Sequence, residues 1–137
     1  MNFPQTKESI AGIWTGRLLG ALVVLSLLAD AGVNVFLPHL LAENLAKIGF
    51  PTGLAPMIGS VLFVSVLLYM IPRTSVLGAV LITAFLGGAI CAHLRIGEIG
   101  SPPQIISALL GIAAWASLYL RNSDVRGLLP LLTRTRI

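Results

Sequence analysis

The feature that most constrains the fold is a long stretch near the middle of the chain that carries no charged residue. From Thr74 to Leu94 the sequence contains no Asp, Glu, Lys or Arg. As an α-helix this stretch would be about 31 Å long, which matches the roughly 30 Å hydrocarbon core of a bilayer. The stretch therefore predicts a membrane-spanning helix, and we expect an integral membrane protein.

Composition supports the same conclusion and excludes several other classes. Apolar residues make up 56% of the 137 residues and charged residues only 10%, whereas a soluble domain carries about 25% charged residues. The single cysteine, Cys91, excludes an internal disulfide and any site built on paired cysteines. The net charge of +4 comes from basic residues near the ends of apolar runs. This pattern favours membrane orientation over nucleic-acid binding.

Four apolar runs predict an all-α fold, a transmembrane four-helix antiparallel bundle in a single membrane domain. The expected spans are residues 17–38, 53–71, 74–94 and 104–120. A short surface helix is expected at 40–48, where Leu and Ile recur at helical spacing opposite Glu43 and Lys47. A cleaved signal peptide is a minor alternative for the first run, because Ala29–Ala31 resembles a cleavage site, but apolar sequence continues well beyond it.

The distribution of basic residues predicts the orientation in the membrane. If four helices cross the bilayer, both termini lie on one side. Of the 9 lysines and arginines, all except Lys47 and Arg95 then fall on that side. Because basic residues accumulate on the cytoplasmic side, we expect cytoplasmic termini and a basic cytoplasmic tail over residues 121–137. The expected location is the cytoplasmic (inner) membrane of a prokaryotic cell.

Small residues at every fourth position predict which face of the third span packs inside the bundle. One row contains Ala79, Thr83, Gly87 and Cys91, and a neighbouring row contains Ala84, Gly88 and Ala92. Such rows let helix backbones approach closely, which is the main source of helix affinity in lipid. We therefore expect this face at the bundle centre and predict that Gly87→Leu would destabilise the bundle severely by overpacking.

Asp30 is the most informative polar residue because it lies within the first span. A charged side chain at such a depth costs about 2.5–3.5 kcal/mol on insertion scales. Asn34 follows one helical turn later on the same face. We predict that Asp30 faces the bundle interior within hydrogen-bond reach of a polar group and is largely protonated. Two interpretations stay open, a titrating functional group and a neutral structural acid.

Estimated depths place further candidates near Asp30, which lies about 12 Å below the outer surface at 1.5 Å per residue. These candidates are Ser60, Gly87, Gly88 and Gly111 at about 10 Å, and Thr83 and Trp115 at about 16 Å. Glycines from two helices at this level predict either tight packing or a cavity walled by Trp115 that opens outward. His93 lies at the outer mouth, about 10 Å too shallow to pair with Asp30.

The sequence predicts no metal site and no catalytic residues. His39 and His93 lack a clear third ligand for a metal ion. No phosphate-binding loop, Ser-His-Asp set or spaced pair of carboxylates is visible.

The block YMIPRTSVLGAVLITAFLGGAICAHLRIG, residues 69–97, resembles the DoxX-like family of small four-span integral membrane proteins. Gly49-Phe50-Pro51 is similar to the Gly-x-Pro element that precedes this block in the family, and Val125–Pro130 is similar to the family's ending. Asn34 stands where the family often has Lys, and Phe85 where Tyr is common. The resemblance implies the four-helix fold and, through the wider family, a link to membrane redox complexes that oxidise quinol.

Three functional hypotheses follow. The leading one is a non-catalytic membrane module that binds a small apolar molecule or quinone, or docks a redox partner, through a pocket beneath His93. The second is a proton-coupled transporter of a small molecule that titrates Asp30. The third, ranked lowest, is a membrane enzyme on a lipid-soluble substrate that uses Asp30 and His93 as acid and base. The sequence is compatible with a homo-oligomer and with a membrane or soluble redox partner, and no nucleic-acid partner is expected.

Overall fold

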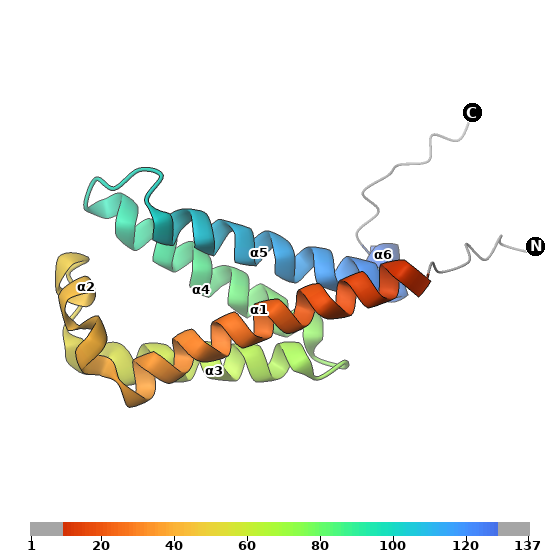
Figure 1. The fold of residues 1–137 in the computed structure, drawn as a ribbon, viewed down its shortest axis with the longest axis horizontal. Helices are drawn as coiled ribbons and strands as arrows, with labels where there is room; N and C mark the ends of the chain where they lie inside the picture. The colour runs from red at the N-terminus through yellow and green to blue at the C-terminus, as the bar shows by residue number, and fades with distance from the viewer. Residues whose placement is uncertain (1–9, 129–137) are drawn as a thin grey trace, which may run out of the picture.

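The computed structural model describes residues 10–128, which form an antiparallel bundle of four long helices (Figure 1). The long helices are α1 (Ile10–Phe36), α3 (Ala55–Met70), α4 (Ser75–Arg95) and α5 (Pro102–Arg121). The short elements are the 3₁₀ helix η1 (Pro38–Leu41), α2 (Ala42–Lys47), the 3₁₀ helix η2 (Thr52–Leu54) and α6 (Ser123–Leu128). No β-strand occurs within residues 10–128. The predicted all-α four-helix bundle is therefore confirmed.

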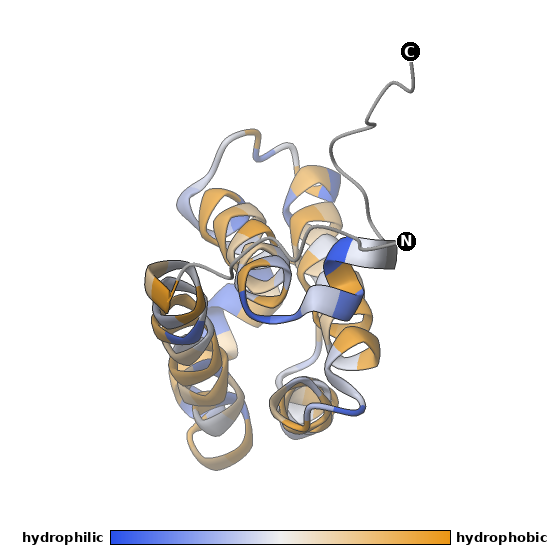
Figure 2. Ribbon diagram, turned by 90° about the vertical axis from the view of Figure 1, so that its right-hand side faces the viewer, coloured by the Kyte–Doolittle hydropathy of each residue, from blue (hydrophilic) through white to orange (hydrophobic). Residues whose placement is uncertain are grey.

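The four long helices are long and apolar enough to cross a membrane, with η2 extending α3. In Figure 2 hydrophobic residues cover most of these helices, and hydrophilic residues gather at the turn before α6. α1 begins at Ile10 rather than at the expected residue 17. The segment expected as a surface helix over 40–48 consists of η1 followed by α2. Residues 1–9, and residues 129–137 of the predicted cytoplasmic tail, lie outside the described part of the chain.

The local sequence explains where several elements begin and end. Pro56 and Pro102 lie in the first turns of α3 and α5, where the missing N–H costs no helical hydrogen bond. The backbone N–H of Ser101 donates to Oε1 of Gln104 (3.1 Å), which satisfies a donor at the start of α5. Gly49 adopts a φ of 76° just after α2, a left-handed conformation that ends helices.

The long helices form a closed ring of contacts around one core. α1 packs against α3 and α5, and α4 packs against the same two helices, so α1 and α4 stand at opposite corners. The Tyr69 hydroxyl of α3 donates to the Ala114 carbonyl of α5 (2.8 Å) and so links the other diagonal. The buried core contains Val23, Leu27, Ala31, Leu62, Val66, Tyr69, Ala79, Ile82, Leu86, Ala114, Leu118 and Val125.

The closest helix contacts depend on glycines that the sequence analysis did not select. A Cβ at Gly20 of α1 would lie 2.6 Å from Oγ of Ser117 in α5, and a Cβ at Gly59 of α3 would lie 2.7 Å from Cβ of Asn34 in α1. Contacts this short leave no room for a side chain. The glycines in such close contacts are Gly16, Gly20, Gly59 and Gly78. Gly16 and Gly20 form a Gly-x-x-x-Gly pair, a recognised signal for helix packing in membranes.

The predicted packing face of α4 is wrong. Ala79 is buried, but Thr83 and Cys91 of the same row are exposed, and no atom lies within 4 Å of a Cβ built at Gly87. Ala84 and Gly88 of the neighbouring row are exposed as well. The buried face consists of Ser75, Gly78, Ala79, Ile82 and Leu86. This face combines three small residues with Ile82 and Leu86. Because nothing lies within 4 Å of a Cβ at Gly87, Gly87→Leu is no longer expected to overpack the bundle.

Candidate functional site

The bundle opens towards the end that carries α2, and a partly polar space lies there. In Figure 1 the helices α1 and α3 diverge from α4 and α5 towards this end. Two adjoining cavities occupy the space, with volumes of about 420 Å³ and about 340 Å³. They share the lining residues Asp30, Phe85, Ala89 and Pro103. We call the two cavities together the Asp30 chamber.

One wall of the chamber is the last part of α1, which carries Asp30 and Asn34. Nδ2 of Asn34 donates to Oδ1 of Asp30 (3.3 Å) and to the Asp30 carbonyl (2.9 Å). The spacing of four residues places both side chains on one helix face. Asn34 is only 5% exposed and packs against Gly59, which leaves room for it. The predicted hydrogen bond between Asp30 and a polar group is present, but Asp30 is exposed, whereas the sequence predicted that it faces the bundle interior.

The opposite wall is α4, which contributes Phe85, Ala89 and His93. Phe85 and Ala89 give this wall an apolar surface, and His93 adds an imidazole near the mouth. Nδ1 of His93 lies 2.6 Å from Oε2 of Glu98. His93 and Asp30 line the same cavity, although the depth count separated them by about 10 Å. Both can line it because the cavity extends along several turns of the diverging helices.

Glu98 connects the two sides of the chamber mouth. Its Oε1 lies 2.5 Å from Nζ of Lys47 at the end of α2, while Oε2 contacts His93. The hydrogen bond from Lys47, and secondly that from His93, lower the pKa of Glu98 to about 2, because both favour the charged carboxylate. Glu98 is therefore ionised across the physiological pH range.

A second contact holds the same two segments together. Nη2 of Arg95, the last residue of α4, donates to the carbonyl of Ile48 just after α2. A Cβ at Gly49 would lie 2.7 Å from that guanidinium nitrogen, so the glycine leaves space for it. We call the Lys47–Glu98 and Arg95–Ile48 contacts the closing contacts, because they bridge the open end of the bundle.

The chamber combines hydrogen-bonding groups near its mouth with apolar walls further in. The polar residues near the mouth that are free of the closing contacts are Asp30, Asn34, Asn44, His93 and Ser101. The inner cavity is walled mainly by Leu27, Phe85, Leu86, Ile106 and Leu110. Such a site suits a small apolar molecule that carries a few hydrogen-bonding groups. Within residues 10–128 no three His, Cys, Asp or Glu side chains lie close enough together to hold a metal ion.

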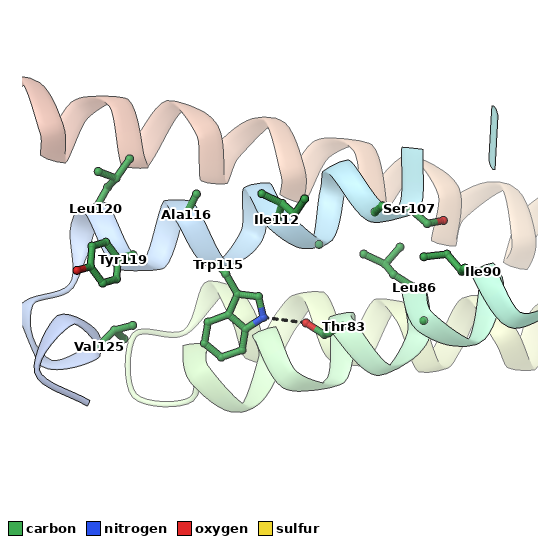
Figure 3. Close-up of a pocket in the computed structure, with 13 residues that line it drawn as sticks. Thr83, Leu86, Ile90, Ser107, Ile112, Trp115, Ala116, Tyr119, Leu120 and Val125 are labelled. Carbon is green, nitrogen blue, oxygen red and sulfur yellow. Dashed lines mark hydrogen bonds between the residues drawn. The ribbon is translucent and has the colours of Figure 1, made fainter. Parts of the chain in front are cut away.

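A second hollow, of about 730 Å³, lies along α4 and α5. Trp115 reaches from α5 towards α4, and its Nε1 donates to Oγ1 of Thr83 (2.9 Å; Figure 3). Val125 of α6 lies at one end of the hollow (Figure 3). The other lining residues are Leu86, Gly87, Ile90, Ser107, Ala108, Gly111, Ile112, Ala116, Tyr119 and Leu120. We call this hollow the Trp115 groove.

The structure divides the site residues predicted from the sequence between these two spaces. Asp30, Asn34 and His93 line the chamber. Thr83, Gly87, Gly111 and Trp115 line the groove. Of the two alternatives predicted, tight packing or a cavity walled by Trp115, the structure has the cavity, but Asp30 does not line it. Leu86 and Ser107, which line both the groove and the inner part of the chamber, stand between them.

Two of the predicted site residues lie in neither space. Ser60 is exposed on α3, and its hydroxyl donates to the Pro56 carbonyl one turn earlier (2.7 Å). Gly88 is exposed on α4, and no atom lies within 4 Å of a Cβ built there. An estimate of depth does not give the direction in which a residue faces.

The sequence analysis missed the roles of Lys47 and Glu98 at the chamber mouth. The two residues lie in different connections that the charge distribution places on the same side of the membrane. Few charges occur on that side, so an acid and a base there would be expected to pair. That signal was available from the sequence, but which of the few charges meet depends on how the helices pack.

Comparison with known proteins gives one match. A family model described as the DoxX-like family matches residues 18–117. The matched range contains both walls of the chamber and the closing contacts. No curated protein and no solved structure matches the chain.

Proposed function

Since the chain belongs to the DoxX-like family and is a multi-pass integral membrane protein, we propose that it is a non-catalytic membrane module that binds a small lipid-soluble molecule in the Asp30 chamber. A neutral planar ring with hydrogen-bond acceptors, as in a quinone, is the proposed ligand class. The proposed location is the cytoplasmic membrane of a prokaryotic cell. A redox partner would then meet the ligand at the chamber mouth.

The observation that carries this proposal is the distribution of polar and apolar side chains in one chamber. Ser101 and Asn44 line the mouth cavity, and the Ser101 hydroxyl has no hydrogen-bond partner within the described residues, so these two side chains can donate to acceptor atoms of a ligand. Phe85 offers an aromatic surface in both adjoining cavities, and offset stacking of aromatic rings is favourable. A planar ring with carbonyl oxygens at its edge fits these requirements better than a charged or fully apolar molecule.

The packing of the helices between the chamber and the α6 end favours binding over transport. Between the chamber and the α6 end the helices pack around fully buried side chains, including Val23, Leu62, Val66 and Ile82. The Tyr69–Ala114 hydrogen bond crosses the bundle in this region. A transported molecule would have to displace this packing, whereas a bound molecule need only enter from the α2 end.

Binding can be tested with ubiquinone-1 as the probe and the full-length protein in detergent micelles. Ala89 lines both parts of the chamber, so Ala89→Leu places extra side-chain volume in the ligand space. We expect this variant to raise the Kd for ubiquinone-1 at least tenfold. Ala84→Leu is the matched control, because Ala84 is exposed on the same helix. Equal affinity of the wild type and Ala89→Leu, or no binding to the wild type, would contradict the proposal.

A proton-coupled transporter is the second candidate, and one observation favours it. Asp30 lines both the mouth cavity and the inner cavity, so a proton on its carboxyl could be exchanged with either. Proteoliposomes with an enclosed pH-sensitive dye would test this function. Proton movement that depends on a small-molecule gradient and disappears in Asp30→Asn would favour transport over simple binding. The membrane enzyme ranks last, because Nδ1 of His93 is already engaged by Glu98.

A further inference from the structure

We propose that the ligand is a single-chain amphiphile whose head binds in the Asp30 chamber and whose hydrocarbon tail lies in the Trp115 groove. This inference rests on the proposed function and names its ligand class more closely. The tail would pass between α4 and α5 beside Leu86 and Ser107. A molecule of this kind carries a small neutral head with hydrogen-bond acceptors and one long acyl or prenyl tail.

The first argument is continuity between the two spaces. Leu86 and Ser107 line both the inner cavity of the chamber and the groove, so these two side chains form the wall between them. The wall is thin on the α5 side, where Gly111 has no side chain and the nearest atom to a Cβ built there is Cδ1 of Leu86 at 3.7 Å. On this proposal the tail displaces the Leu86 side chain, which packs against the backbone of Gly111, and so joins the two spaces.

The second argument is the chemistry of the groove. Trp115 Nε1 donates to Thr83 Oγ1 (2.9 Å), and Thr83 in turn donates to the Ala79 carbonyl (2.7 Å). These polar groups are satisfied within the protein, so the groove presents almost only apolar surface to an occupant. The hydrogen-bonding groups suited to a head lie instead in the chamber. The two spaces therefore differ in the same way as the two ends of an amphiphile.

The third argument is the shape and setting of the groove. Its lining on α5 runs from Ser107 to Leu120, which corresponds to about 20 Å along the helix. A long, narrow groove of this length fits an extended hydrocarbon tail better than a compact molecule. Because α4 and α5 are membrane-spanning helices, a tail in the groove stays at the level of the lipid chains, while the head is sheltered between the helices.

The experiment compares ubiquinone-0, which has no tail, with decylubiquinone, which has a ten-carbon tail. Both are titrated into the wild type, Gly87→Leu and Gly88→Leu in the same detergent. Gly87 lines the groove but not the chamber, and Gly88 lines neither. Added side chains have open space at both positions, so both variants should fold. Each quinone is compared between the three proteins, so the different partitioning of the two quinones into micelles does not affect the comparison.

We expect Gly87→Leu to bind ubiquinone-0 within twofold of the wild type and decylubiquinone at least tenfold more weakly. Gly88→Leu should match the wild type for both. If decylubiquinone binds equally to all three proteins while ubiquinone-0 also binds, the tail site is wrong and the chamber proposal stands. If neither quinone binds the wild type, both proposals fail. If Gly87→Leu changes the oligomeric state by light scattering without changing either affinity, a second copy of the chain covers the groove and the inference is overturned.

Discussion

Asp30 and Asn34 form a polar pair whose geometry depends on a single turn of α1. The amide of Asn34 donates to both the side chain and the backbone carbonyl of Asp30, so the pair exists whatever the other helices do. Its surroundings depend on the other helices, because Gly59 of α3 admits Asn34 and Phe85 of α4 faces the pair across the chamber. One turn of α1 therefore brings the Asp30 and Asn34 side chains together, and the packing of the other helices forms the chamber in front of them.

Substitution of Asp30 separates its structural role from its chemical role. Asp30→Asn should fold normally and bind ubiquinone-1, because the amide oxygen can still accept the hydrogen bond from Asn34. Asp30→Leu removes that acceptor, and a hydrogen bond of this kind contributes about 1 kcal/mol, so we expect a Tm lower by about 3 °C and weaker ubiquinone-1 binding. Thermal unfolding in detergent and titration would measure these effects. An Asp30→Leu variant with unchanged Tm and affinity would mean that the carboxyl serves neither role.

Gly59 and Gly87 provide a paired test of where the helices touch. A Cβ at Gly59 would lie 2.7 Å from Cβ of Asn34 and 2.8 Å from the Ala31 carbonyl, whereas nothing lies within 4 Å of one at Gly87. Overpacking costs typically about 1–3 kcal/mol, so Gly59→Leu should lower the Tm by several degrees or prevent folding. Gly87→Leu should leave the Tm within about 2 °C of the wild type. Equal losses of stability in both variants would show that α4 packs through Gly87 after all.

The short elements at the open end of the bundle hold together its two halves, the pair of α1 and α3 and the pair of α4 and α5. α2 and the connection after α4 belong to different halves, and the closing contacts join them through Lys47, Glu98, Arg95 and Ile48. Gln104 of α5 supports this connection, since its Nε2 donates to the Glu98 carbonyl (2.9 Å). The long helices alone would leave the chamber open between their diverging ends, so these contacts define its mouth.

The pKa of Glu98 predicts how the closing contacts respond to acid. The folded protein lowers this pKa from 4.5 to about 2, so the unfolded state binds the proton more readily. The stabilisation from Glu98 is therefore fully present above about pH 5 and is lost as the pH falls from 4.5 to about 2. The difference in Tm between the wild type and Glu98→Gln should shrink as the pH falls below about 5.

The control for this experiment is Glu43→Gln, since Glu43 is an exposed acid on α2 that forms no ion pair within residues 10–128. Its Tm should follow that of the wild type at every pH. A difference between the wild type and Glu98→Gln that persists undiminished at pH 3 would contradict the role assigned to the ionised Glu98.

At the scale of the whole molecule, the bundle has two different ends. The α2 end contains the chamber, Lys47 and Arg95. The other end contains the start of α1, the Pro72–Arg73 turn and α6, and on our proposal it faces the cytoplasm. A ligand that enters the chamber at the α2 end would then come from the outer leaflet or from outside the membrane.

Reporter fusions test the proposed orientation. Basic residues near the ends of spans are retained on the cytoplasmic side, and all lysines and arginines except Lys47 and Arg95 fall on the side of the termini. A fusion after Ile137 should report the cytoplasm, and so should an insertion after Arg73. An insertion at Glu43 should report the opposite side. A reporter outside the cytoplasm at Ile137 would reverse the proposed orientation and the side from which the ligand enters.

The sequence by itself determined the features that depend on one segment at a time. Whether a helix spans the membrane depends on the length and polarity of that helix, so Thr74–Leu94 already predicted α4. The Asp30–Asn34 hydrogen bond depends on one helical turn, and the sequence already placed these two side chains on one helix face. Only the tertiary structure decided which face of α4 is buried, that Gly59 rather than Gly87 touches a neighbouring helix, and that Lys47 meets Glu98. The physical reason is that membrane-spanning helices are apolar on all sides, because lipid is as apolar as the core. Burial therefore leaves no periodic signal in the sequence, and the inward faces are fixed by the fit between helices.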